Sequence, residues 1–274
     1  MGMSGDNDDF GDRMKAYEAV ETARAFDPAL PVYARIDGRS FSRFTRQMQR
    51  PFDPRMTATM VATTAHLVKG THARIGYTQS DEISLVWLCD TPETEPLFGG
   101  KVHKMTSVLA SLAATAFNFE LPQHFGDEGR LLTARFPHFD ARVFQLPSKV
   151  EAANAFLWRA MDARKNAVSM ATRAVYSSKA MHGAAQTAMR AMLAEKGIDF
   201  ESYPPAFKRG TFVRRLNYER FLTADELADI PEKHRPPADE PVIRSTVREI
   251  EMPEFHRVAN RVEVVFDGAD PIVQ

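Results

Sequence analysis

The sequence predicts an α+β fold whose elements follow the order β-α-β-β-α-β, the split arrangement of ferredoxin-like proteins. Three observations support this prediction. An apolar run at 32–37 ends in Asp-Gly, two β-type runs within 72–89 are joined by a short polar turn, and a helical stretch of small residues at 102–118 precedes a strand-like run at 140–146. With 274 residues, 44% of them hydrophobic, the chain can bury a full core and is sized for one or two domains.

Each element of the first part has a local sequence signal. A helix at 12–26 should end before Asp27-Pro28, because a residue that precedes proline avoids the helical region. Asp53 can cap the next long helix, and Pro54 suits the first position of that helix. The elements expected before Pro147 are helices at 12–26, 39–48, 54–70 and 102–118, strands at 32–37 and 140–146, and a hairpin at 72–89.

The chain changes character after Pro147, and we divide it there. Residues 1–146 form the first domain, which begins with an acidic, Gly-rich arm, and residues 147–274 form a helical, strand-edged section packed on it. In the second section we expect two or three helices within 148–196, a strand pair at 211–220 and 241–251, and a last strand at 262–266.

Carboxylates lie at two strand ends that the predicted sheet brings together. Asp37 follows the strand at 32–37, and Asp81 and Glu82 occupy the turn of the hairpin. Acidic residues are common in turns, and either motif alone is more often structural than catalytic. Two neighbouring carboxylates can, however, hold a pair of Mg²⁺ ions against a triphosphate, because Mg²⁺ prefers carboxylate and phosphate oxygens. The pair therefore favours nucleotidyl transfer.

Two lysines add to this interpretation. Lys101 and Lys104 open the helical stretch at 102–118 and lie on one face of its first turn. Cations at the start of a helix oppose the helix dipole, so their position needs another reason. A bound triphosphate would provide one.

Composition sets limits on the cellular setting. The single cysteine, Cys89, argues against a disulfide scaffold and fits a reducing cytosol. Neither a signal peptide nor a membrane-spanning segment is evident, so we expect a soluble, cytoplasmic protein without a membrane partner.

Charge is unevenly distributed although the net charge is only −1. Residues 35–74 contain eight Arg or Lys and two acids, and residues 158–190 contain six Arg or Lys and one acid. This asymmetry suits a protein with one phosphate-binding face, although each single arginine is more often part of a solvated surface. Aromatic residues are sparse in these basic stretches, which predicts no stacking platform for nucleic-acid bases.

The order of the motifs resembles the tRNA-histidine guanylyltransferase superfamily, most of all its bacterial and archaeal guanylyltransferase-like branch. The similarity extends from about residue 14 to about residue 215, and its motifs are R-I-D-G-R-S-F-x-R-F, R-P-F-D, Y-T-Q-S-D-E-I-S, K-x-x-K before a small-residue helix, F-D-A-R-V, L-P-S and W-R-x-x-D. The resemblance implies a polymerase-like palm domain and 3′-5′ addition of nucleotides to the 5′ end of tRNA.

The resemblance also implies roles for individual residues. Asp37, Asp81 and the backbone carbonyl of Gly38 would hold two Mg²⁺ ions, with Glu82 as an accessory catalytic acid, needed for activity or for shaping the turn. The residues implied for nucleotide binding are Asp37, Gly38, Arg39, Ser40, Phe41, Ser42, Arg50, Ser80, Asp81, Lys101 and Lys104. Those implied for tRNA binding are Arg142, Trp158, Arg159, Asp162, Arg164, Lys165 and Asn166.

One departure from the family pattern bears on specificity. Eukaryotic members that guanylylate tRNA-histidine carry H-I-N-N two residues after the aspartate that matches Asp162, whereas residues 164–167 of this chain read R-K-N-A. The departure favours template-dependent extension or repair of tRNA 5′ ends, with ATP or GTP as activating nucleotide, over guanylylation restricted to one tRNA. The family also implies a homotetramer.

Alternatives remain open at this point. One is guanylyltransferase activity proper, and another is a nucleotide cyclase built on the same palm. A non-catalytic tRNA-binding module would not need Asp37, Asp81 and Glu82 to be intact.

Overall fold

A six-stranded antiparallel sheet forms the centre of the computed structural model, which describes residues 6–274 except 90, 92 and 238. The strands are β1 (Val32–Gly38), β2 (Ile75–Gln79), β3 (Glu82–Trp87), β4 (Phe139–Gln145), β5 (Thr211–Arg220) and β6 (Val242–Ile250). Their order across the sheet is β4-β1-β3-β2-β5-β6. The first four strands with two crossover helices give β-α-β-β-α-β, which confirms the predicted ferredoxin-like α+β fold.

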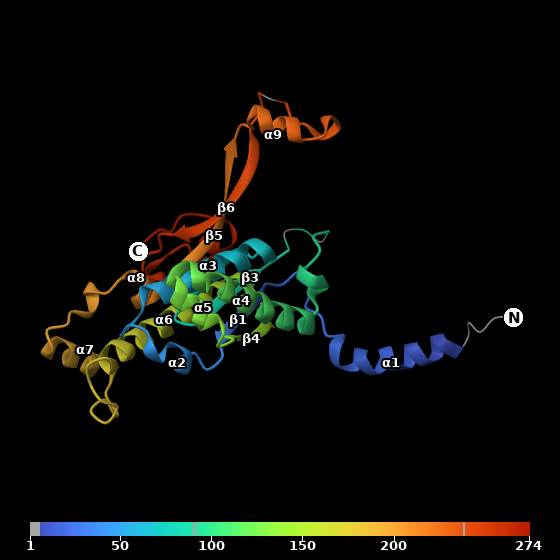
Figure 1. Cartoon of the computed structure of the whole chain (residues 1–274). Coiled ribbons are helices and arrows are strands. Elements are labelled where there is room, and N and C mark those ends of the chain that lie inside the picture. Colours follow the sequence, from blue (N-terminus) through green and yellow to red (C-terminus); the bar gives the residue numbers. More distant parts are fainter. Residues whose placement is uncertain (1–5, 90, 92, 238) are drawn as a thin grey trace.

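Helices cover both faces of the sheet (Figure 1). The described helices are α1 (Asp6–Thr22), α2 (Phe41–Phe44), α3 (Pro54–Thr71), α4 (Val102–Phe125), α5 (Asp127–Thr133), α6 (Lys149–Arg173), α7 (Gln186–Glu195), α8 (Pro205–Arg209), α9 (Ala224–Asp229) and α10 (Arg261–Phe266). Asp53 caps α3 by accepting from the Arg55 backbone N–H at 3.0 Å, and Ser148 caps α6 by accepting from the Glu151 N–H at 3.2 Å. No described helix is both long and apolar enough to cross a membrane.

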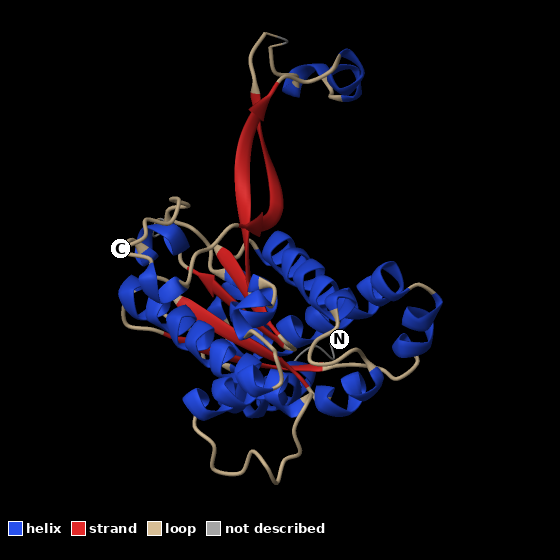
Figure 2. Ribbon diagram, turned by 90° about the vertical axis from the view of Figure 1, so that its left-hand side faces the viewer, coloured by secondary structure: helices blue, strands red, loops and turns tan. Residues whose placement is uncertain are grey.

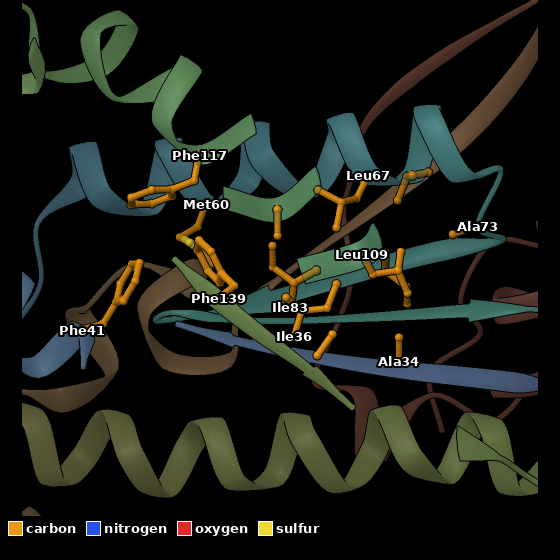
Figure 3. Packing of buried hydrophobic residues seen from close by; sticks show 14 of the residues in the cluster. Ala34, Ile36, Phe41, Met60, Leu67, Ala73, Ile83, Leu109, Phe117 and Phe139 are labelled. Carbon is orange, nitrogen blue, oxygen red and sulfur yellow. The ribbon is translucent and has the colours of Figure 1, made fainter. Parts of the chain in front are cut away.

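Alternate residues of β1 face two different hydrophobic cores, one on each side of the sheet. Ala34 and Ile36 are fully buried against α3 and α4, as the labelled side chains of Figure 3 show, whereas Tyr33 packs with α6 and α10 on the other face. On β2, a Cβ at Gly76 would lie 2.6 Å from the Thr64 side chain, so glycine allows α3 to pack closely. Arg35 and Asp37 share the face of Tyr33 and therefore point toward α6.

Two parts of the chain project from this body. The outer halves of β5 and β6 form a two-stranded arm with α9 at its tip (Figure 2), and α1 extends away from the sheet (Figure 1). Near its start β5 pairs with β2, so strands from the second section extend the sheet of the first. The division at residue 147 itself stays a prediction.

Several predicted elements differ from the structure. The first helix begins at Asp6 and ends at Thr22, rather than covering 12–26, and the helix at 39–48 shortens to α2 and a 3-10 turn. The expected last strand at 262–266 is the helix α10, because Val264, Val265 and Phe266 are buried on that side of the sheet and this packing overrides their β preference. The helix at 102–118 continues to Phe125, with Pro122 in its last turn.

Candidate active site

The end of β1 and the tip of the β2–β3 hairpin meet at one edge of the sheet. Asp37 lies opposite Glu82 on β3 and opposite Asp140 on β4. The Gly38 backbone N–H donates to the Asp81 carbonyl oxygen at 3.0 Å, which fixes the hairpin tip against β1. A Cβ at Gly38 would lie 2.5 Å from the Phe41 ring, so only glycine fits without displacing that ring. The two predicted metal-binding aspartates are therefore held on adjacent turns.

Electrostatics at this edge disfavour ionised carboxylates. Burial, followed by the negative charge of Asp37, raises the pKa of Asp81 to about 6. The pKa of Asp37 is also raised, first by burial and then by Asp140, although Arg35 and Arg159 act in the opposite direction. A cation bound nearby would stabilise the ionised form of both carboxyl groups.

The donor set suits Mg²⁺ bound together with phosphate. Asp37, Asp81 and the Gly38 carbonyl supply hard oxygens, and Mg²⁺ commonly takes its remaining ligands from substrate phosphates and water. Over the described residues, no group of three or more His, Cys, Asp or Glu side chains is arranged to hold a metal ion. The arrangement therefore suits a Mg²⁺ site that is completed by substrate phosphate better than a site formed by protein ligands alone.

A cavity of about 700 Å³ opens beside Gly38 and Asp81. Its walls come from the loop before α3, the hairpin tip and the end of α6, and Arg50 and Arg173 bring positive charge to it. Volumes of this order hold nucleotide-sized ligands. Of the residues predicted to bind nucleotide, Gly38, Ser40, Phe41, Ser42, Arg50, Ser80 and Asp81 line this cavity.

Glu82 has a different environment from the two aspartates. Arg159 donates to both of its carboxylate oxygens, from Nε at 2.5 Å and from Nη2 at 2.8 Å, and Arg35 Nε lies 3.6 Å away. The Glu82 and Arg159 side chains are only 14% and 12% exposed. Glu82 therefore ties the hairpin to α6, which suits a role in shaping the tip better than one as an accessory acid.

Lys101 and Lys104 lie far from the carboxylates within one chain. Lys101 forms an isolated antiparallel β-bridge with Ala25, which precedes β1. Asp37 lies at the other end of that strand. A seven-residue strand spans roughly 20 Å, so within one chain these lysines do not reach the triphosphate that the carboxylates would hold. The physical reason is the crossover: α4 starts where β3 ends, opposite the hairpin turn.

Several residues predicted to contact tRNA also make contacts within the chain. Arg159 binds Glu82, Asp162 accepts from Arg159 at 3.1 Å, and Asn166 donates to Asp162 at 3.3 Å. Arg164 forms ion pairs with Glu201 and Glu254. The exposed members of the predicted set are Arg142, Trp158, Lys165 and Asn166.

The structure adds residues that sequence reasoning missed. Asp140 on β4 pairs with Asp37 on β1. Arg35, which belongs to the R-I-D-G-R motif, forms an ion pair with Glu82. Arg173 enters the cavity from the last turn of α6. The alternation of β1 and β4 could have indicated the first two, whereas no local signal distinguishes Arg173 from the other basic residues of α6.

The fold and this edge of the sheet define the class of palm-fold nucleotidyltransferases. The family model described as tRNA-His guanylyltransferase matches residues 11–147, which is half of the chain. The chain therefore belongs to the tRNA-histidine guanylyltransferase family, whose members are nucleotidyltransferases.

Relatives with known sequences agree with this assignment. An uncharacterised protein of Acanthamoeba polyphaga mimivirus is 34% identical over 188 residues, which cover 59% of this chain and 61% of that protein. A protein of Schizosaccharomyces pombe named tRNA(His) guanylyltransferase is 30% identical over 156 residues, 55% of this chain and 57% of that protein. The chain thus spans about three fifths of the length of these two relatives.

Solved structures extend the comparison to the fold. A bacterial tRNA(His) guanylyltransferase-like protein in complex with ATP superimposes with a TM-score of 0.69 at 32% identity, over 75% of this chain and 88% of that one. A second structure, of a bacterial guanylyltransferase-like protein in complex with GTP, gives a TM-score of 0.67 at 27% identity, over 90% and 94% of the two chains.

Proposed function

We propose that the chain is a template-dependent 3′-5′ nucleotidyltransferase that adds nucleotides to the 5′ end of tRNA. The observation that carries the proposal is the pair Asp37 and Asp81, held together at the sheet edge beside a cavity of nucleotide size. Family membership and the ATP and GTP complexes of two bacterial guanylyltransferase-like proteins support it.

The reaction has two transfers at one site. In the first, an oxygen of the 5′-monophosphate attacks the α-phosphorus of ATP or GTP, and pyrophosphate leaves. In the second, the 3′-hydroxyl of the incoming nucleotide attacks the 5′ phosphorus of the RNA, and the nucleoside monophosphate leaves. Asp37, Asp81 and the Gly38 carbonyl would hold two Mg²⁺ ions, which supply activation of the attacking hydroxyl and neutralisation of the leaving group. Residues 40–42 would offer backbone N–H groups to phosphate, and Arg50 and Arg173 add positive charge.

We infer repair of 5′ ends rather than addition of one guanosine to tRNA-histidine. Residues 164–167 lack the H-I-N-N sequence of the eukaryotic guanylyltransferases. In addition, Arg164 forms ion pairs with Glu201 and Glu254, which supports a structural role for the first of these positions. Base selection would then come from pairing with the opposite strand.

Incorporation assays test this specificity. We expect the enzyme to add the Watson-Crick complement at a missing first position in tRNAs with different anticodons, and to follow the opposing base. The measurement is incorporation of each of the four nucleotides into truncated tRNAs whose opposing base is varied. Addition of G regardless of that base, and only to tRNA-histidine, would contradict repair, and cyclic nucleotide formed without RNA would favour the cyclase.

The distant lysines bear on the proposed homotetramer. Because Lys101 and Lys104 lie at the end of the sheet opposite Asp37, they can contact an activating triphosphate at the carboxylates only if a second copy of the chain brings them there. A tetramer with shared sites is compatible with both the sequence expectation and the geometry of one chain.

Mixing two inactive variants tests a shared site. If the lysines act between copies, Lys104→Ala and Asp37→Ala proteins unfolded and refolded together should regain part of the activity that each lacks alone, because mixed oligomers contain intact composite sites. Activity on 5′-monophosphate tRNA is measured before and after mixing, with mass measurement of the oligomer. If the mixture is no more active than the sum of the two separate variants, these lysines do not act at the active site of another copy.

A further inference from the structure

An exposed tryptophan lies close to the carboxylates. The side chain of Trp158, on α6, is 52% exposed. The Arg159 guanidinium lies 4.6 Å from the centre of its ring, and the Arg35 guanidinium lies 5.5 Å from it. Both arginines are held by Glu82. The ring is therefore supported by two fixed cations while much of its surface faces solvent.

The position of Trp158 relates it to the proposed reaction centre. Arg35 lies two residues before Asp37 on β1, and alternate residues of a strand share one face. The neighbouring strand places Arg142 opposite Arg35 and Asp140 opposite Asp37. Trp158 thus lies next to the strand positions that lead to the carboxylates, on the face of the sheet that α6 covers.

The nucleotide-sized cavity is a separate place. Trp158 does not line it, and the α6 residues that do, Met170 and Arg173, are 12 and 15 positions further along the helix. At 1.5 Å per residue, Met170 lies about 18 Å from Trp158 along the axis of α6. Asp81 lines the cavity, whereas Arg35, two residues before Asp37 on β1, lies beside the tryptophan.

The neighbours of Trp158 are unusual for an exposed aromatic side chain. Most such rings lie on apolar surface, whereas Trp158 lies beside two arginines that are already paired with Glu82. A ring that is 52% exposed, beside two guanidinium groups fixed by Glu82, can offer its free surface to another flat ring, and nucleobases stack on such side chains without sequence preference.

We propose that Trp158 stacks an unpaired nucleobase of the RNA substrate, at or next to its 5′ end. The proposal rests on the proposed function, because it assigns the two sides of the carboxylates to the two substrates. The cavity with Arg50 and Arg173 takes the nucleotide triphosphate, and the RNA approaches along α6. Arg142, whose side chain is 54% exposed, is positioned to meet an RNA phosphate on this side. This proposal differs from the sequence expectation that the basic stretches lack a stacking platform.

Tryptophan fluorescence tests the contact directly. The chain has two tryptophans, and the other, Trp87, is 9% exposed and donates from Nε1 to the Thr71 carbonyl oxygen. Adding a short RNA hairpin with an unpaired 5′ nucleotide should quench the exposed tryptophan, and a blunt-ended hairpin should quench it much less. The quenching should disappear in Trp158→Phe while the RNA still binds.

Substitution gives the size of the effect. We expect Trp158→Ala to weaken binding of the hairpin with the unpaired nucleotide by about 5- to 150-fold, the range for loss of one stacked base. Trp158→Phe should retain most of the binding, because a phenyl ring still stacks. The KM for the nucleotide triphosphate should be unchanged in both. Phe119→Ala is the matched control, since Phe119 is 61% exposed but lies on α4, which covers the opposite face.

Three results would overturn the proposal. They are quenching by nucleotide triphosphate without RNA, equal losses in the Ala and Phe variants, and a loss in Phe119→Ala as large as in Trp158→Ala. Binding is measured without nucleotide, so it does not depend on transfer. If the hairpin quenches Trp158 but no nucleotide is added to any RNA, the stacking contact stands and the proposed function fails.

Discussion

Asp81→Asn is expected to reduce nucleotide addition to tRNA by about 10²- to 10³-fold or more, because it removes one of the two carboxylates proposed to hold Mg²⁺. The same substitution should stabilise the folded protein when divalent cations are absent. Burial and the charge of Asp37 raise the pKa of Asp81 to about 6, so the folded state disfavours its ionised form. Loss of activity with a gain in stability would separate a catalytic role from a structural one.

The pH dependence gives the sign of this effect. Between about pH 4 and pH 6 the folded chain binds more protons at Asp81 than the unfolded chain, so the free energy of unfolding falls as the pH rises through this window. The cost above pH 6 is on the order of 1–3 kcal/mol. In EDTA at pH 7.5, Asp81→Asn should therefore raise the Tm by a few degrees, and at pH 4 the two proteins should have nearly equal Tm values.

Magnesium provides the complementary measurement. Mg²⁺ should raise the Tm of the wild-type protein at pH 7.5, because it binds the folded state, and should have little effect on Asp81→Asn. Asp267→Asn is a suitable control, since its side chain is 57% exposed and the residue follows α10, away from the hairpin tip. Near-normal transfer by Asp81→Asn, or an equal Mg²⁺ effect in both proteins, would contradict the proposed metal site.

The sequence predicted the carboxylate pair because its signals are local. An apolar strand that ends in Asp37 and a hairpin whose turn contains Asp81 leave one simple arrangement once the strands pair. The ferredoxin-like order of elements followed from the change between strand-like and helix-like hydrophobic periodicity along the chain. Both inferences need only nearest neighbours in the chain and the rules of strand pairing.

Long-range contacts account for what the sequence left out. Arg159 was expected to bind tRNA, but its partner Glu82 lies 77 residues earlier, and no pattern around either residue shows that they meet. The helical conformation of 261–266 depends on burial against the sheet and α6, which overrides a Val-rich sequence. The direction of α4, by contrast, follows from the crossover and could have placed Lys101 correctly.

Arg159→Ala should be among the most destabilising substitutions in the chain. It would leave the Glu82 carboxylate, 14% exposed, without its bidentate partner, and removal of one member of a buried ion pair costs about 3–5 kcal/mol. Burial already raises the pKa of Glu82, and Arg159 is the main group that lowers it, so the variant should take up a proton at Glu82 more readily. Its stability should therefore fall further as the pH rises above the ordinary pKa of a glutamic acid.

A double-mutant cycle tests this assignment by thermal or urea unfolding. Glu82→Gln in the Arg159→Ala background removes the uncompensated charge, so it should restore part of the stability and remove most of the added pH dependence. Arg164→Ala is the matched control on the same helix, and its loss should be smaller because its own side chain is 36% exposed and its partners Glu201 and Glu254 are 49% and 26% exposed. Additive effects of the Arg159 and Glu82 substitutions, or a loss at Arg164 as large as that at Arg159, would show that the Glu82–Arg159 pair does not hold the hairpin tip to α6.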